Sequence, residues 1–559
     1  MQNDFSCYLV LLETSGNQHY IFSTNKLKEN IGASELTYRV GTQFVLDAVL
    51  QLTNRPAIQF ESVDRIRSWL LNPQSNPSIE SPNTRVEVII ATSGKALLLV
   101  KTLKDGQFII QTVTHRALKE AAGIDICGVI SEPFQWSGYR MGEMNRQVHE
   151  RFESVRSRCP SPELRFPRLP IIDECATSGL PAAWLDPKAP NGITLRSEVS
   201  RAKRKAEHSG KKRIQQTTQL RLADSLRTLD REYNRENDSD VAQKKLSWIG
   251  IVHADGNGLG QIFLNFKTHA KNNREYINKY RSFSIGLDIC TENAFLTALE
   301  TLPQGEITPI VPLILGGDDL TVLCDGQSSL TFTHKFLESF EAQTEQSISQ
   351  LGNYQTIIRD IAQKTYGTTR LSACAGVAIV KSHFPFSVAY KLAEDLISSA
   401  KQVKQVIPVP CSALDFHVLY DTSNVSLENI RQKLIVDRGR TKLYGRPYIV
   451  TDIAKLPALD WVEPRQWKHL QERLEKLKAK DDDDRRILPS SQMHDLRAGL
   501  FLGQAPADAR YKLIRDRYPD LRSLAVNEES LFWQETTDQM NVTGFLDAMD
   551  ALSLEEVAQ

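Results

Sequence analysis

The sequence Gly316-Gly317-Asp318-Asp319 lies between two apolar stretches, residues 310–315 and 320–324. This order predicts a β-hairpin whose tip presents two adjacent carboxylates. Paired glycines permit backbone angles closed to other residues and leave room for a nucleotide, while adjacent carboxylates attract a hard divalent cation. Alone, this tetrapeptide would be weak evidence for a function.

A second acidic position lies upstream, where an apolar stretch from Trp248 ends at Asp255 and is followed by Gly256, Asn257 and Gly258. We expect a strand, a glycine-rich turn and a helix. The chain between Asp255 and the hairpin is long enough for a crossover helix and a return strand, so the two acidic positions can meet.

Three carboxylates in one place can hold two Mg²⁺ or Mn²⁺ ions, which neutralise a triphosphate and activate a hydroxyl for in-line displacement. That chemistry is nucleotidyl transfer by a palm-type domain. Glycine and aspartate are also ordinary turn residues, so either motif alone would fit a surface turn equally well. Their combination in this order favours catalysis.

The 559 residues predict roughly three or four domains. A hydrophobic content of 41%, a charged content of 24% and a formal net charge of +0 give no overall field that favours nucleic acid or an anionic membrane. The chain has no long apolar run and no signal-peptide pattern at Met1, which predicts a cytoplasmic protein without a membrane partner. Eight dispersed cysteines indicate reduced thiols.

The predicted fold class is α+β, with two tandem ferredoxin-like palm domains of the nucleotide-cyclase (GGDEF-like) type, a helical linker region and a helical C-terminal domain. We expect a first palm at 1–130, the linker at 131–243, the catalytic palm at 244–455 and the helical domain at 456–559. Trp467, Leu470, Leu474 and Leu477 have helical spacing in the last region.

The first palm is expected to lack metal ligands. Strand-like residues 86–91 and 96–101 flank the turn Thr92-Ser93-Gly94-Lys95, at the place where the later unit has its two glycines and two aspartates, and no carboxylate lies in that turn. Further strand and helix patterns occur at 8–12 and 115–122.

Residues 201–213 hold seven Lys or Arg and one Glu. This run fits either a mobile, phosphate-seeking segment that contacts RNA or, more commonly, a solvated helix face or loop.

Several segments together resemble the large polymerase-cyclase subunit of type III CRISPR effector complexes. The first-palm segments are 16–22, 26–27 and 32–34. The later ones are 371–380, 383–385, 393–401, 415–417 and 446–448.

The resemblance implies a cyclase that makes a cyclic nucleotide or cyclic oligonucleotide from ATP or another nucleoside triphosphate, as a second messenger in antiviral defence read by a nucleotide-sensing effector. Asp255, Asp318 and Asp319 would bind the metal, and Lys401 would face the phosphates. Further nucleotide contacts are implied for Gly256, Asn257, Gly316, Gly317, Gln18, Asn25 and Ser34. We expect His253 to point to the opposite face of its strand from Asp255 and to pack rather than act as a base.

Two departures from the family pattern matter. The chain starts almost at once with the first palm, so no HD nuclease domain is expected, and the isolated His494-Asp495 pair does not replace it. In the zinc-knuckle segment Ser178 stands where a second cysteine is usual, so Cys175 and Cys159 supply only two of four ligands, and no zinc is expected.

Two other functions remain open. One is a catalytically quiet, RNA-binding scaffold subunit of a type III CRISPR-like effector complex. The other is a template-dependent polymerase, although the sequence shows no extended basic cleft and no separate thumb and fingers. Dependence on added primer and template separates the polymerase from a cyclase.

Overall fold

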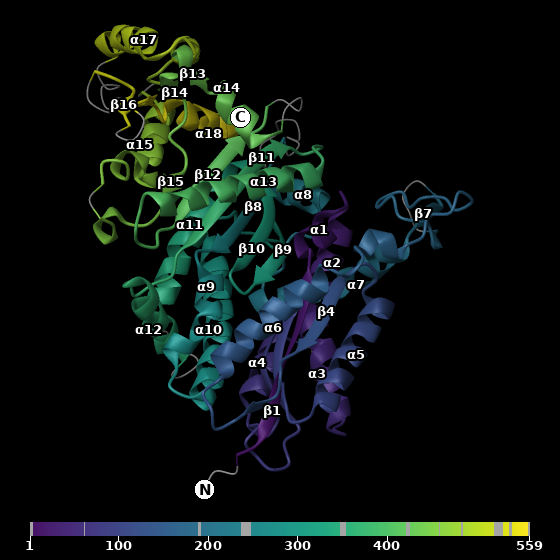
Figure 1. The fold of residues 1–559 in the computed structure, drawn as a ribbon. Helices are drawn as coiled ribbons and strands as arrows, with labels where there is room; N and C mark the ends of the chain where they lie inside the picture. The colour runs from purple at the N-terminus through teal and green to yellow at the C-terminus, as the bar shows by residue number, and fades with distance from the viewer. Residues whose placement is uncertain are drawn as a thin grey trace.

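The computed structural model describes residues 4–60, 62–187, 192–235, 247–346, 354–420, 425–457, 459–481, 485–518, 529–535 and 539–556. Two sheets with their covering helices form an elongated molecule, with the N-terminal unit at one end and the C-terminal elements at the other (Figure 1). The two tandem palm domains predicted from the sequence are present.

The first palm is a ferredoxin-like βαββαβ unit. Its strands β1 (Ser6–Ser15), β2 (Val86–Thr92), β3 (Lys95–Val100) and β4 (Asp125–Ile130) pair in the antiparallel order β2-β3-β1-β4. Every residue of β3 after Lys95 is buried, which explains its unbroken apolar sequence. Helices α2 (Leu27–Gly41), α3 (Gln43–Leu52), α4 (Val63–Leu71) and α5 (Leu103–Glu120) provide the crossovers.

The second palm repeats this topology. Its strands β8 (Trp248–Gly256), β9 (Ile310–Gly316), β10 (Asp319–Asp325) and β11 (Ala373–Lys381) have the order β11-β8-β10-β9, which corresponds strand for strand to the first sheet. The crossovers are α10 (Asn273–Leu299) and α11 (Gly326–Glu345). Helix α13 (Phe386–Ala400) then leads to β12 (Ala413–Val418), which pairs parallel to β11, and β15 (Tyr448–Ile449) closes the sheet.

The linker region is largely helical, with α6 (Met141–Arg156), α7 (Glu198–Thr218), α8 (Leu226–Arg235) and a small hairpin of β6 (Trp184–Asp186) and β7 (Thr194–Arg196). Helix α7 packs along α2 of the first palm.

The basic run 201–213 lies within α7, so of the two alternatives a helix is present and a mobile segment is not. Lys203 is 1% exposed, with its ammonium group against the Tyr20 carbonyl. Arg213 Nε lies 2.8 Å from Glu35 Oε2, and Arg204 Nη1 lies 3.7 Å from Glu29 Oε1, both on α2. These side chains hold the helix against the first palm rather than forming a free basic arm.

The C-terminal region contains the expected helices: α15 (Trp467–Lys478), α16 (Ser490–Leu500), α17 (Gln504–Arg517) and α18 (Phe545–Glu556). Trp467, Leu470 and Leu477 are buried on α15, as their spacing predicts. A small sheet was not predicted: β14 (Thr441–Lys442) pairs with β13 (Ile435–Val436) and with β17 (Asn541–Val542), which pairs with β16 (Trp533–Gln534). In the part of the chain that the structure describes, no helix has the length and apolar character needed to cross a bilayer.

Candidate functional site

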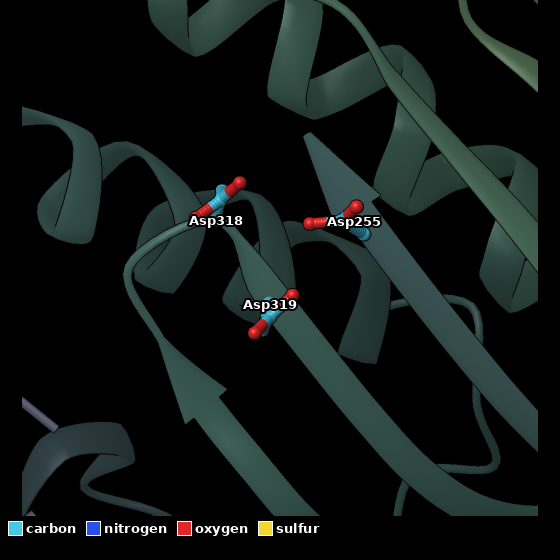
Figure 2. A group of neighbouring side chains, drawn as sticks. All are labelled: Asp255, Asp318 and Asp319. Atoms are coloured by element: carbon cyan, nitrogen blue, oxygen red, sulfur yellow. The ribbon is translucent and has the colours of Figure 1, made fainter. Parts of the chain in front are cut away.

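Three carboxylates converge where β8, β10 and the β9–β10 turn meet. Asp255 lies near the end of β8, Asp318 in the turn and Asp319 at the first residue of β10. One carboxylate oxygen from each lies within 4.8 Å of the others, and Figure 2 shows the three side chains around one space. The predicted meeting of the two acidic motifs is confirmed.

The sheet register and two glycines produce this convergence. Leu320 pairs with Ala254, so one antiparallel step further places Asp319 opposite Asp255. Gly317 has a φ of +65°, which only glycine adopts without strain. At Gly256 a Cβ would lie 2.9 Å from Asp318 Cβ, so a side chain there would displace the carboxylate.

The carboxylates are electrostatically crowded. Burial and the neighbouring Asp319 raise the pKa of Asp318 to about 7, and burial raises the pKa of Asp319. Without a cation, ionisation of all three carboxylates is unfavourable because their negative charges repel one another. Carboxylate oxygens are the ligands that suit Mg²⁺ or Mn²⁺. Among the described residues, this is the one group of three or more acidic, His or Cys side chains with metal-binding geometry.

Lys401 follows α13, and its Nζ contacts Asp255 Oδ2. Burial, with a contribution from Lys404, lowers the pKa of Lys401. The predicted lysine is therefore beside the carboxylates, with a salt bridge to one of them.

A cavity of about 340 Å³ separates the two palms beside the carboxylates. Gly316, Gly317, Asp318 and Asp319 line it from the second palm, while Gln18 and Ser34 line it from the first. Glu13, Gly94, Lys95 and Tyr38 of the first palm and Arg213 of α7 complete that opposite wall. The volume is within the range typical of ligand sites.

Two predicted nucleotide contacts point elsewhere. The Asn25 side chain accepts hydrogen bonds from the backbone N and the Oγ of Ser387, both at 3.1 Å. The Asn257 amide donates to Ser372 Oγ at 2.9 Å and to the Cys411 carbonyl at 3.0 Å. These contacts tie the first palm to α13 and the Asp255 turn to the loop before β12.

The sequence reasoning missed Glu13 and Lys95. They pair across β1 and β3, with Lys95 Nζ 3.2 Å from Glu13 Oε2. Aligning the two strand–hairpin units would have found them, because the turn at Gly94 corresponds to that at Asp318.

The prediction that His253 points to the opposite face of its strand from Asp255 is wrong. Strand side chains alternate with a period of two, so His253 and Asp255 share a face rather than pointing oppositely. His253 lines the inter-palm cavity, with Nδ1 3.0 Å from Thr321 Oγ1. Burial lowers its pKa, although Asp319 opposes the shift.

In the zinc-knuckle segment Cys175 contacts Ser178, whereas Cys159 lies beside another cysteine. Cys175 Sγ lies 3.4 Å from Thr177 Oγ1, and Ser178 Oγ lies 3.0 Å from Ser197 Oγ. Cys159 Sγ lies instead 3.7 Å from Cys127 Sγ. In the tail, Asp495 Oδ1 lies 3.1 Å from Arg510 Nη1.

The chain is similar to several solved structures. A Csm1–Csm4 cassette in complex with pppApA has 12% identity and a TM-score of 0.48, with 100% of this chain and 70% of that chain covered. A Csm1–Csm4 cassette in complex with cA3 has 10% identity and a TM-score of 0.49, with 100% of this chain and 70% of that chain covered. Csm1 in T. onnurineus has 11% identity and a TM-score of 0.49, with 98% of this chain and 69% of that chain covered. No curated protein matches by sequence.

Residues 248–406 match the family described as Cas10/Cmr2, second palm domain. The matched segment starts at the first residue of β8, contains all three carboxylates and ends after Lys401. It agrees with the resemblance drawn from the sequence. The chain therefore carries, at residues 248–406, the second palm domain of the Cas10/Cmr2 family.

Proposed function

We propose that this protein is a nucleotidyltransferase that makes a cyclic nucleotide or cyclic oligonucleotide from ATP or another nucleoside triphosphate. The observation that carries the proposal is the grouping of Asp255 with Asp318 and Asp319, the last two of which line a cavity whose opposite wall is a second palm. One palm would then hold the donor nucleotide and the other the acceptor. The match of residues 248–406 to the Cas10/Cmr2 second palm supports the same reaction class.

Asp255, Asp318 and Asp319 fit a pair of Mg²⁺ or Mn²⁺ ions. When bound, such ions neutralise phosphate charge and lower the pKa of an attacking hydroxyl. The Lys401 ammonium beside Asp255 supplies a fixed positive charge at the edge of the site, suited to a departing pyrophosphate. Gly316 and Gly317 keep the turn free of side chains where the nucleotide enters.

The acceptor would lie against the first palm. Gln18 and Ser34 offer hydrogen-bonding groups there, and Lys95 and Arg213 offer positive charge without a metal. The ribose hydroxyl of this nucleotide would attack the α-phosphate of the other, so that one phosphodiester bond forms and pyrophosphate leaves.

The proposal is tested by incubating purified protein with each labelled nucleoside triphosphate and Mg²⁺ or Mn²⁺, with products identified by mass spectrometry. A matched reaction uses the double variant Asp318→Ala, Asp319→Ala, and a parallel one adds primer and template. A cyclic or oligomeric product that the double variant does not make supports the cyclase. A requirement for template supports a polymerase, and nucleotide binding without product, even with target RNA, supports the scaffold.

Such a product would act through a nucleotide-sensing effector in antiviral defence. Binding of the isolated product to a candidate effector, measured by calorimetry, tests this partner separately from the enzyme.

A further inference from the structure

The turn that carries Asp318 is held by two side chains of α10. The backbone N–H of Gly317 donates to Asp288 Oδ1 at 2.8 Å, and Thr291 Oγ1 donates to the Gly317 carbonyl at 2.6 Å. Both backbone groups of the residue immediately before Asp318 are therefore fixed by one helix. A glycine turn without these two bonds would have many accessible backbone conformations.

Asp288 has a second partner, in the other palm. Its Oδ2 contacts Arg67 Nη2, and Arg67 lies on α4 of the first palm. Arg67 also holds Glu292 through two 2.8 Å hydrogen bonds, one from each terminal nitrogen. One oxygen of Asp288 thus holds the turn while the other contacts the first palm.

This contact is buried and geometrically specific. Arg67 is only 8% exposed, and a forked guanidinium–carboxylate pair fixes the orientation of both groups. Asp288 and Glu292 both contact Arg67 Nη2, and burial together with the adjacent Asp288 raises the pKa of Glu292 to about 7. Removing Arg67 would leave them facing each other without it, and an unpaired buried charge is strongly unfavourable.

We propose that Arg67, Asp288 and Thr291 are positioning residues that tie the Gly316–Gly317 turn, and with it Asp318, to the first palm. A shift of α4 relative to α10 would be transmitted to the metal-binding carboxylates. The catalytic consequence rests on the proposed function, whereas the positioning of the turn does not.

A matched control exists on the same helix. Arg281 of α10 is 9% exposed and donates to Glu87 Oε1 of the first palm at 2.9 Å. Replacing it with Met breaks a buried contact between the palms, as Arg67→Met does, but Arg281 does not contact the turn.

The test compares Arg67→Met, Asp288→Ala, Asp288→Asn and Thr291→Val with Arg281→Met. Hydrogen–deuterium exchange follows the peptide that contains Gly317, and calorimetry measures Mn²⁺ affinity. We expect Asp288→Ala to speed exchange of the turn about tenfold and weaken Mn²⁺ binding about tenfold, because the Gly317 N–H loses its acceptor. Arg67→Met should speed exchange of the turn and weaken Mn²⁺ binding about threefold each. Arg281→Met should change neither quantity.

Asp288→Asn separates the two halves of the contact, since its amide oxygen still accepts from Gly317 while its amide nitrogen faces Arg67. Its turn should exchange more slowly than that of Asp288→Ala. If Arg67→Met has the same turn exchange and the same Mn²⁺ affinity as Arg281→Met, the link to the first palm is overturned. If Asp288→Ala does not fold, turn exchange in Thr291→Val equal to that of the wild type would overturn the positioning role.

Product formation by the wild type decides the proposed function separately. If the protein forms no product, that function fails, and turn exchange still decides this inference. If product forms, Arg67→Met should lower kcat more than it changes KM, because the nucleotide-contacting side chains remain.

Discussion

Lys95 and Glu13 pair across β3 and β1 at the register positions that correspond to Asp319 and Asp255 in β10 and β8. The correspondence extends to the next strand, since Glu13 is opposite Cys127 and Asp255 is opposite Cys374. A cation of the chain itself thus occupies the first palm at a position where the second palm has a carboxylate. The two palms thus differ in charge at the Lys95 and Asp319 position, whereas both have a carboxylate at the Glu13 and Asp255 position.

This relationship predicts that Lys95 holds nucleotide phosphates from the first palm. Lys95→Met should weaken nucleoside triphosphate binding about tenfold, or ~1.4 kcal/mol, because a charge-assisted contact is lost. Glu13→Gln should instead tighten binding, since it removes the negative charge beside the Lys95 ammonium. Affinity is measured by calorimetry without metal, with Lys101→Met at the far end of the first sheet as control. Equal weakening of nucleotide binding by Lys95→Met and Glu13→Gln would contradict the prediction.

The raised pKa of Asp318, about 7, predicts pH-dependent metal binding. Below pH 7 an incoming Mn²⁺ ion must displace a proton, so its apparent affinity should fall about tenfold per pH unit. Above pH 8 the affinity should be nearly constant. Calorimetry in buffers of different ionisation enthalpy measures the released protons: close to one at pH 6 and close to none at pH 8.5. Equal proton release at both pH values would contradict the assignment.

The same shift predicts a stability effect of known sign. The folded state raises the pKa of Asp318 above its ordinary value of 3.8, so the stabilising contribution of the protonated carboxyl is complete below pH 3.8 and is lost as the pH rises through 7. Without metal at pH 8, Asp318→Asn should therefore be more stable than the wild type by about 1 kcal/mol, after allowance for partial exposure. Thermal unfolding at pH 8 and pH 5 measures the difference, which should shrink at pH 5. Added Mn²⁺ should stabilise the wild type more than the variant, and a variant less stable at pH 8 would refute this account.

The sequence predicted the meeting of the three carboxylates because the information for it is local. A strand ending at Asp255 and a glycine hairpin bearing Asp318 are recognisable from neighbouring residues, and the length between them allows only a few connections.

The contacts that the sequence did not reveal are distant or lack a distinct pattern. Arg67 and Asp288 are 221 positions apart, and the sequence around each residue gives no indication that the two are in contact. Lys203 belongs to a run of basic residues that looks exposed, yet packing against α2 buries it. The small sheet containing β14 and β17 consists of two-residue strands, too short to show any alternation.

The last helix, α18, is part of the fold of the second palm, and this predicts a large cost in stability for breaking its contact. Arg446 Nε lies 2.9 Å from Asp547 Oδ1, and both side chains are 0% exposed. Asp547 Oδ2 also accepts hydrogen bonds from the Gly445 N–H and from Tyr448 Oη, both at 2.8 Å.

Asp547→Ala should destabilise the protein by about 3–5 kcal/mol, because it leaves Arg446 buried without its partner. Glu338→Ala, which breaks the exposed pair with Lys335 on α11, should cost no more than about 1 kcal/mol. Urea unfolding followed by tryptophan fluorescence measures both. Residues 244–455 expressed alone should be less stable than the full chain for the same reason, since Arg446 then lacks Asp547. Equal stabilities for Asp547→Ala and Glu338→Ala would show that α18 is an independent appendage.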